Sequence, residues 1–253
     1  MKNWKIRLQR ITFAIAGLCV SVLSVTSQSL MSDFGFGFDR WSYNNVVFPY
    51  RKAVISADDA QHSKPALVVY LHGGSKCGND NVSQMTEEAI YTIADYLRRS
   101  RIHAVMIVPQ CPDSLTWGAR TNEAIKALID EYVEKEKVDA DRIYLLGGSM
   151  GGTGTWLMTS AYPHLFAAVM PVAGNPETAD AGLVASTPAY TVMGTDDSLM
   201  TIPRVSTFVG QLNERGGEAL LDKEKGWSHM KTCTDSYTEE RLDWIFGHKR
   251  LKY

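Results

Sequence analysis

The run ALVVYL at residues 66–71 constrains the fold of this chain most strongly, because none of its six positions holds a charged or strongly polar side chain. A strand of this kind is buried on both faces, which is typical of a parallel sheet covered by helices. Residues 103–108 and 142–146 form two further β-prone runs, and Pro109 ends the first of them. The sequence therefore indicates a central sheet that is enclosed on two sides.

Segments with helical periodicity lie between these runs. In the clearest, residues 123–137, apolar side chains recur at positions i, i+3, i+4, i+7 and i+8 from Ile125. In chain order, we expect strands at 66–71, 103–108, 142–146, 167–172, 190–193 and 219–223, and helices at 87–99, 123–137, 152–162, 202–215 and 239–246. This alternation predicts an α/β fold with a mostly parallel central sheet and helices on both faces. Residues 33–55 suit an antiparallel hairpin at one edge.

A serine among five glycines joins the strand at 142–146 to the next helix, in the segment RIYLLGGSMGGTGTW. Gly147, Ser149 and Gly151 form a G-x-S-x-G motif in a strand–turn–helix context. Side chains at the flanking positions would collide in so tight a turn, which explains the glycines. The turn also raises the serine hydroxyl above the sheet. The motif predicts that Ser149 is a nucleophile, and an incidental serine in a glycine-rich turn is the alternative.

A serine hydroxyl needs a base that takes up its proton. Of the six histidines, His229 is predicted to be this base, because it follows the last short strand, at 219–223. Asp196 and Asp197 both follow the strand at 190–193, and we prefer Asp197 as the carboxylate that orients the imidazole. The resulting chain order of Ser, Asp and His is the one expected for this type of turn.

The segment YLHGGS follows the first long strand and fits an oxyanion-binding loop. Glycines there let backbone N–H groups approach a substrate closely. The amides of Gly74 and Met150 are the predicted pair of donors to the tetrahedral intermediate. His72 is then expected to brace the loop, and a plain strand-to-loop turn is the alternative interpretation.

The N-terminus has the layout of a secretory signal peptide. Four basic residues within the first ten positions precede the apolar run ITFAIAGLCVSVLSV at residues 11–25, and Ser27 offers a cleavage position. We expect a signal peptide at residues 1–27 and a secreted or periplasmic protein; an uncleaved membrane anchor is the alternative. The run is short for a membrane span, and polar residues interrupt it.

Residues 28–253 are expected to form a single catalytic domain, since α/β folds of this length are commonly one domain. Cleavage after Ser27 removes four positive charges and no negative ones, which changes the formal net charge from −2 to −6. A mildly acidic protein gives no reason to expect nucleic acid as a partner. No His/Cys cluster suggests a metal, and no cofactor is expected. The oligomeric state is left open.

These residues resemble the α/β-hydrolase superfamily. The segments LHGGSKCGNDN, VPQCPDSLTW, DRIYLLGGSMGGTGTW and YPHLFAAVMPVAG are similar to a secreted esterase group that includes feruloyl esterases, acetylxylan esterases and polyhydroxyalkanoate depolymerase-like enzymes. This group is related to the catalytic domains of prolyl-oligopeptidase-type proteins. The resemblance covers the chain from about residue 40 onward and implies serine hydrolysis without a cofactor. Only about 25 residues separate Val172 from Asp197, so no lid domain is expected.

Two tryptophans and two cysteines are further candidates at the site. Trp117 or Trp227 could stack against an aromatic acyl group or a sugar, and packing in the core or at the rim is the alternative for each. After signal cleavage the chain keeps Cys77, Cys111 and one more cysteine, Cys233. A disulfide between Cys77 and Cys233 would brace the catalytic loops, but the sequence does not choose among the three pairings or exclude free thiols.

The sequence thus predicts a secreted serine carboxylesterase. By resemblance, its substrates are acetyl or hydroxycinnamoyl esters, on small molecules or on plant polysaccharide. A peptidase or amidase of prolyl-oligopeptidase type is one alternative. A non-catalytic glycan-binding protein on a hydrolase fold is the other, and a complete Ser–His–Asp set speaks against it.

Overall fold

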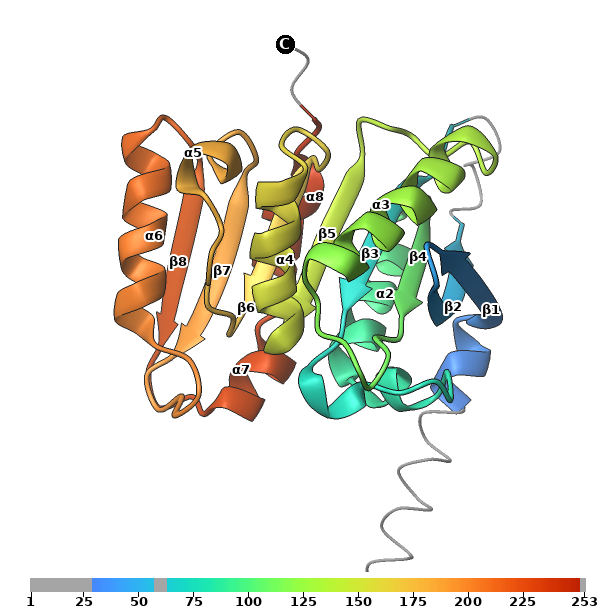
Figure 1. Cartoon of the computed structure of the whole chain (residues 1–253), viewed down its shortest axis with the longest axis horizontal. Coiled ribbons are helices and arrows are strands. Elements are labelled where there is room, and N and C mark those ends of the chain that lie inside the picture. The colour runs from blue at the N-terminus through green and yellow to red at the C-terminus, as the bar shows by residue number, and fades with distance from the viewer. Residues whose placement is uncertain (1–28, 57–62, 251–253) are drawn as a thin grey trace, which may run out of the picture.

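Eight strands form one open sheet in the computed structural model, which describes residues 29–56 and 63–250 (Figure 1). The predicted signal peptide at residues 1–27 lies outside the described residues. The strands are β1 (Gly37–Tyr43), β2 (Val46–Ile55), β3 (Ala66–Leu71), β4 (Ala104–Pro109), β5 (Ile143–Gly148), β6 (Ala168–Val172), β7 (Ala189–Gly194) and β8 (Ala219–Glu224). Their spatial order is β1-β2-β4-β3-β5-β6-β7-β8. All pairs from β4 to β8 are parallel, which confirms the predicted mostly parallel sheet.

The antiparallel hairpin expected at residues 33–55 is present at one edge of the sheet. β1 and β2 are joined by Asn44 and Asn45, whose φ angles are 45° and 62°. Two-residue hairpins favour this left-handed backbone because its twist matches that of the strands, and asparagine tolerates it better than most residues. β2 then pairs antiparallel with β4.

Helices cover both faces of the sheet, as predicted (Figure 1). One face carries α3 (Ala119–Glu134), α4 (Met150–Ala161), α5 (Ala181–Val184) and α6 (Ile202–Glu214), and the other carries α2 (Glu88–Arg99) and α8 (Glu239–Gly247). Side chains of β3 alternate between the two cores: Leu67, Val69 and Leu71 pack under α3 and α4, whereas Val68 and Tyr70 pack under α2. The buried apolar run therefore separates two cores.

Some helix ends differ from the predicted ones. The helix expected at 123–137 begins earlier because Gly118 and Thr121 cap it, the Gly118 N–H donating to the Thr121 hydroxyl at 2.8 Å. It ends at Glu134, before Lys137, whose φ of 58° is incompatible with a helix. The helix expected at 152–162 begins at Met150, directly after the turn. The sequence did not predict α5, α7 (His229–Asp235), or the 3₁₀ turns η2 (Gly74–Lys76) and η3 (Ser83–Thr86).

No lid domain interrupts the sheet: residues 173–188, all of them described, hold only the four-residue helix α5. Within the described residues, no helix combines the length and the apolar character that crossing a membrane requires.

The carboxyl ends of the parallel strands meet at one end of the sheet, at the bottom of Figure 1. Arg250, the last described residue, lies at the opposite end. There its N–H donates to the Asp141 carbonyl at 2.8 Å and its Nη2 lies 3.0 Å from Asp141 Oδ1, just before β5 begins.

Candidate active site

Ser149 lies in a strained turn between β5 and α4. Its φ of 58° and ψ of −120° place it outside the regions that residues with a side chain usually adopt. Glycines make the turn sterically accessible: a Cβ on Gly147 would lie 2.6 Å from the Gly151 carbonyl oxygen, and one on Gly151 would lie 1.8 Å from that of Leu71. The turn has the strand–turn–helix geometry that the sequence predicts, with Ser149 at its apex.

His229 connects Ser149 to Asp197 through two short hydrogen bonds. Its Nε2 lies 2.8 Å from Ser149 Oγ, and its Nδ1 lies 2.7 Å from Asp197 Oδ2. A carboxylate can only accept, so the imidazole carries its proton on Nδ1 and presents Nε2 as an acceptor to the serine hydroxyl. This arrangement can remove the proton from Ser149 as it attacks a carbonyl carbon.

Asp197, rather than Asp196, contacts the imidazole. The Asp197 side chain is fully buried, and its second oxygen accepts the N–H groups of Leu199 at 2.8 Å and Met200 at 2.9 Å. Asp196 is exposed and accepts the Thr195 hydroxyl at 3.1 Å. The backbone donors hold the Asp197 carboxylate in place, and Asp196 belongs to the turn.

The loop that carries Asp197 is tied to the loop that carries His229. The Asp196 N–H donates to the Trp227 carbonyl at 3.1 Å. A Cβ on Gly194 would lie only 2.1 Å from the same oxygen. His229 is then the first residue of α7, which Ser228 caps. The sequence predicts only that His229 follows the last short strand, and the short helix that fixes it was not predicted.

Gly73 and Gly74 pass beside Ser149. A Cβ on Gly73 would lie 3.5 Å from Ser149 Cβ, and one on Gly74 would lie 3.7 Å from the Met150 sulfur. Neither the Gly74 N–H nor the Met150 N–H donates a hydrogen bond to another described residue. Met150 also begins α4, whose N-terminal end favours negative charge. The two predicted donors therefore flank the nucleophile, with their N–H groups available to an oxyanion.

His72 braces this glycine pair through a hydrogen bond to Gly73. Its Nε2 accepts the Cys111 N–H at 2.9 Å, so its Nδ1 carries the proton and donates to the Gly73 carbonyl at 2.7 Å. The side chain is fully buried, and burial lowers the pKa of His72 to about 4. The imidazole is thus neutral near pH 7, and it acts as a fixed strut between two backbone groups.

Trp117 lies in the core, so its predicted place in a substrate pocket is wrong. Only 2% of its surface is exposed, and its Nε1–H donates to the His72 carbonyl at 2.8 Å. It packs so closely on α4 that a Cβ on Gly154 would lie 2.3 Å from the Cβ of Trp117. Its ring packs edge-on against the His72 ring, with the centroids 5.1 Å apart.

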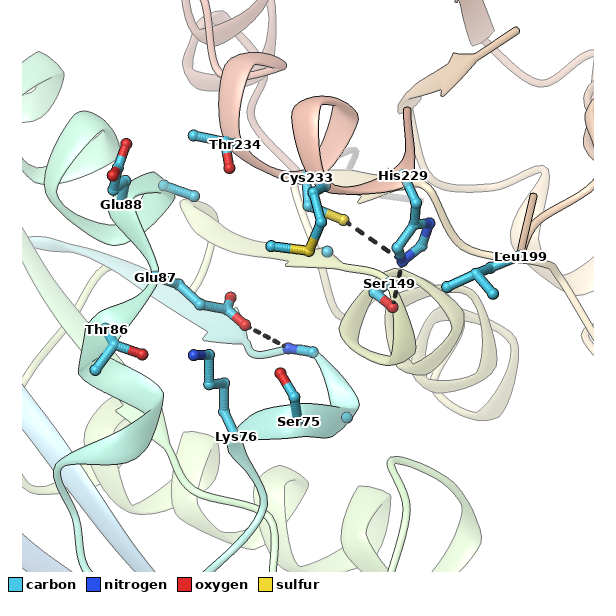
Figure 2. A pocket seen from close by; sticks show the side chains of 15 residues that line it. Ser75, Lys76, Thr86, Glu87, Glu88, Ser149, Leu199, His229, Cys233 and Thr234 are labelled. Atoms are coloured by element: carbon cyan, nitrogen blue, oxygen red, sulfur yellow. Dashed lines mark hydrogen bonds between the residues drawn. The ribbon is translucent and has the colours of Figure 1, made fainter. Parts of the chain in front are cut away.

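A cavity of about 430 Å³ opens beside Ser149 and His229 (Figure 2). Leu199 and Met230 line it next to these two residues, although 66% and 73% of their own surfaces are exposed. On the opposite side the lining is polar and comes from residues Ser75, Lys76, Thr86 and Glu87. Sequence reasoning missed all of these, although Leu199 and Met230 lie next to the predicted acid and base in the chain.

Trp227 is also outside this cavity. Its ring is half-buried and lies beneath the Lys231 ammonium group, 4.9 Å from the ring centroid. Lys231, a residue of α7, thus covers one face of the ring.

The three described cysteines are free thiols, so the candidate disulfide between Cys77 and Cys233 is absent and the alternative of free thiols holds. Cys77 packs against the core under α3, near Cys111, whereas Cys233 packs against the core under α2. Cys233 instead lines the cavity, with its sulfur 3.9 Å from His229 Nε2. Burial raises the pKa of Cys233 to about 12, which keeps the thiol neutral beside the imidazole.

No set of three or more His, Cys, Asp or Glu side chains in the described parts of the chain is placed to hold a metal ion. The chemistry that this site can perform is nucleophilic: a serine with a base, a carboxylate behind the base, and two amides for a developing negative charge.

Comparisons with known proteins agree with the fold. A family profile described as alpha/beta hydrolase fold matches residues 66–211, more than half of the chain. Feruloyl esterase B of Neurospora crassa is 28% identical over 187 residues, which cover 69% of this chain and 56% of that protein. Acetylxylan esterase A of Emericella nidulans is 29% identical over 127 residues, which cover 45% of this chain and 39% of that protein.

A solved structure described as a thermostable esterase superimposes with a TM-score of 0.79 at 25% identity. The match covers 85% of this chain and 63% of that one. The chain thus spans about half the length, or less, of the two fungal relatives it matches.

Proposed function

The chain belongs to the α/β-hydrolase family, and we propose that it is a secreted serine carboxylesterase that acts through an acyl-enzyme on Ser149. The observation that carries this proposal is the continuous set of hydrogen bonds from Asp197 through His229 to the Ser149 hydroxyl, at 2.7 and 2.8 Å. Ser149 lies beside the N–H groups of Gly74 and Met150, and both Ser149 and His229 line a cavity. Acyl transfer through a serine uses this combination of groups.

The proposed reaction has two halves. His229 accepts the proton of Ser149 as the serine oxygen attacks the ester carbonyl, and the amides of Gly74 and Met150 hold the resulting oxyanion. The imidazolium, stabilised by Asp197, then protonates the departing alcohol. In the second half His229 takes a proton from water, the hydroxide attacks the acyl-enzyme, and the acid leaves as Ser149 recovers its proton.

The proposed substrates are acetyl or hydroxycinnamoyl esters, carried by a small molecule or by plant polysaccharide. The names of the two fungal relatives support this class. So do the exposed apolar side chains of Leu199 and Met230 beside Ser149, since they can contact an acyl group. With only α5 between β6 and β7, no lid domain would keep a bulky polymer from the cavity.

The test is a substrate panel of p-nitrophenyl acetate, p-nitrophenyl butyrate, methyl ferulate and acetylated xylan, assayed with the wild type and Ser149→Ala. We expect the wild type to cleave at least one of these esters and Ser149→Ala to lose at least about 10³-fold in kcat. Ser42→Ala, at an exposed serine on the hairpin edge, is the matched control and should match the wild type.

Two results would overturn the proposal. One is ester cleavage that survives the loss of the Ser149 hydroxyl. The other is turnover of aminoacyl-prolyl anilides by a wild type that leaves every ester intact, which would indicate a peptidase. Export is tested separately, by sequencing the N-terminus of the exported protein, which we expect to begin at Gln28.

A further inference from the structure

Glu87 precedes α2 and lines the cavity, yet it does not cap its own helix. It occupies the N-cap position, where a carboxylate usually accepts an N–H of the first helical turn, but its side chain makes no such bond. Instead, Oε1 accepts the Gly73 N–H at 2.8 Å (Figure 2), and Oε2 accepts the Tyr70 hydroxyl at 2.9 Å. Glu87 therefore bonds to Gly73 in the oxyanion-binding loop and to Tyr70 in β3, and not to the first turn of α2.

The peptide group between His72 and Gly73 is held at both ends. Its carbonyl accepts the Trp117 Nε1–H at 2.8 Å, and its N–H donates to Glu87. Both partners are side chains from outside the loop. Because a peptide group is planar and rigid, two such bonds fix its orientation.

The next peptide group, between Gly73 and Gly74, is fixed from its carbonyl side. That carbonyl accepts His72 Nδ1–H at 2.7 Å and the Lys76 N–H at 3.1 Å. In a trans peptide the N–H points away from the carbonyl, so these bonds direct the Gly74 N–H away from the His72 ring and the Lys76 N–H. Glycine has the broadest range of backbone angles, so the Gly73 torsions depend on hydrogen bonds at both neighbouring peptide groups, and losing Glu87 would remove the restraint on the Gly73 N–H.

The surroundings of Glu87 make it a stiff support. Tyr70 is fully buried and packs edge-on against Tyr237, with ring centroids 6.0 Å apart. No Lys or Arg nitrogen in the described part of the chain forms an ion pair with Glu87. Burial raises the pKa of its carboxyl group, and the bonds from Gly73 and Tyr70 and the charge of Lys76 oppose this shift. A carboxylate without a direct ion pair is costly to bury, which fits a group retained for its hydrogen bonds to Gly73 and Tyr70.

We infer that Glu87 is a positioning residue: it clamps Gly73 so that the Gly74 N–H faces the oxygen on which negative charge develops. This inference rests on the proposed esterase function. Glu87 touches neither the substrate carbonyl nor Ser149 in this role. It acts through the loop, as a hydrogen-bond acceptor and not through its charge.

Glu87→Ala and Glu87→Gln test the inference as a pair. Alanine removes the acceptor, whereas glutamine keeps an oxygen for Gly73 and removes only the charge. We expect Glu87→Ala to lower kcat 10- to 100-fold, somewhat less than the loss of a whole oxyanion donor, with KM within about threefold of the wild type. Glu87→Gln should stay within about fivefold in kcat.

A second measurement separates positioning from general damage to the fold. A trifluoromethyl ketone forms a tetrahedral adduct whose oxyanion uses the Gly74 N–H, whereas the product alcohol has no carbonyl oxygen to place there. Inhibition by the ketone should weaken in parallel with kcat/KM in Glu87→Ala, while inhibition by the alcohol stays unchanged. Asp180→Ala removes an N-cap carboxylate that does bond its own helix, at Gly182, and should leave kcat and both inhibition constants unchanged.

If Glu87→Ala does not fold, Glu87→Asp replaces it, because the shorter side chain keeps the charge and withdraws the oxygen from Gly73. The same loss of kcat and of ketone affinity is expected. The inference is overturned if Glu87→Gln is as impaired as Glu87→Ala or Glu87→Asp, or if removing the acceptor leaves ketone inhibition intact. A failure of the proposed function looks different, since it leaves the wild type inert towards esters or Ser149→Ala fully active.

Discussion

Gly151, the second residue of α4, has no room for a Cβ atom. A Cβ built there lies 1.8 Å from the carbonyl oxygen of Leu71, 2.5 Å from its carbonyl carbon and 3.0 Å from the His72 oxygen. All three are backbone atoms, so no side chain can rotate away. Restoring even a 3.0 Å separation from the Leu71 oxygen requires a movement of about 1.2 Å of α4 against the end of β3.

Two opposing effects set the stability of Gly151→Ala. Overpacking of a rigid core costs about 1–3 kcal/mol, and contact with backbone alone places this site at the upper end of that range. Alanine returns about 1 kcal/mol through its better helix propensity. We therefore expect a net loss of about 2 kcal/mol in the free energy of unfolding. Because Leu71 and His72 lead directly into the oxyanion-binding loop, kcat should also fall by about 100-fold.

The assay is urea unfolding followed by circular dichroism, together with kcat on p-nitrophenyl acetate. Gly210→Ala is the matched control: Gly210 lies inside α6, and a Cβ there meets nothing within 4 Å. It should gain about 0.5–1 kcal/mol and keep its activity. A Gly151→Ala protein that is as stable and as active as Gly210→Ala would refute the steric account of the turn.

Two further predictions concern Asp197 and His72. Asp197→Asn should lower kcat by about 10⁴-fold because the imidazole loses the carboxylate that selects its tautomer, whereas Asp196→Asn should stay within about twofold. The reverse ranking in steady-state kinetics would contradict the assignment. For His72, the folded pKa of about 4 lies below the ordinary value of 6.5, so between these values the unfolded chain binds the proton more tightly. The free energy of unfolding should therefore fall by up to roughly 3 kcal/mol as the pH is lowered from 6.5 to 4. Urea unfolding at pH 7 and pH 4.5 measures this, and His72→Gln should lose that part of the pH dependence. An unchanged dependence would show that His72 does not cause it.

The sequence predicts those parts of the fold whose local chemistry permits one solution. The apolar run at 66–71 could only be a strand buried on both faces, and it is β3. Gly147 and Gly151 mark positions where side chains do not fit, so the G-x-S-x-G motif between a strand and a helix predicts the turn around Ser149. His229 and Asp197 follow strands whose order along the chain is readable, and the structure brings both residues to Ser149.

The parts that the sequence did not predict depend on contacts between distant segments. Trp117 is 45 residues from the His72 carbonyl it bonds, and a tryptophan has the same apolar signature in a core and in a pocket. Cys77 and Cys233 both flank the site in the chain, but the sheet separates them, and only the topology decides that. Glu87 resembles an ordinary helix N-cap until its partner Gly73, 14 residues away, is known.

The position of Arg250, bonded to Asp141 at the far end of the sheet from Ser149, has a practical consequence. A carbohydrate-binding module or a solid support joined after this residue would leave the mouth of the cavity pointing away from the junction. Immobilised or fused forms should then reach ester groups on a surface without obstruction by their own attachment. A linker at this end would change how closely the enzyme is held to such a surface and leave the reacting groups undisturbed.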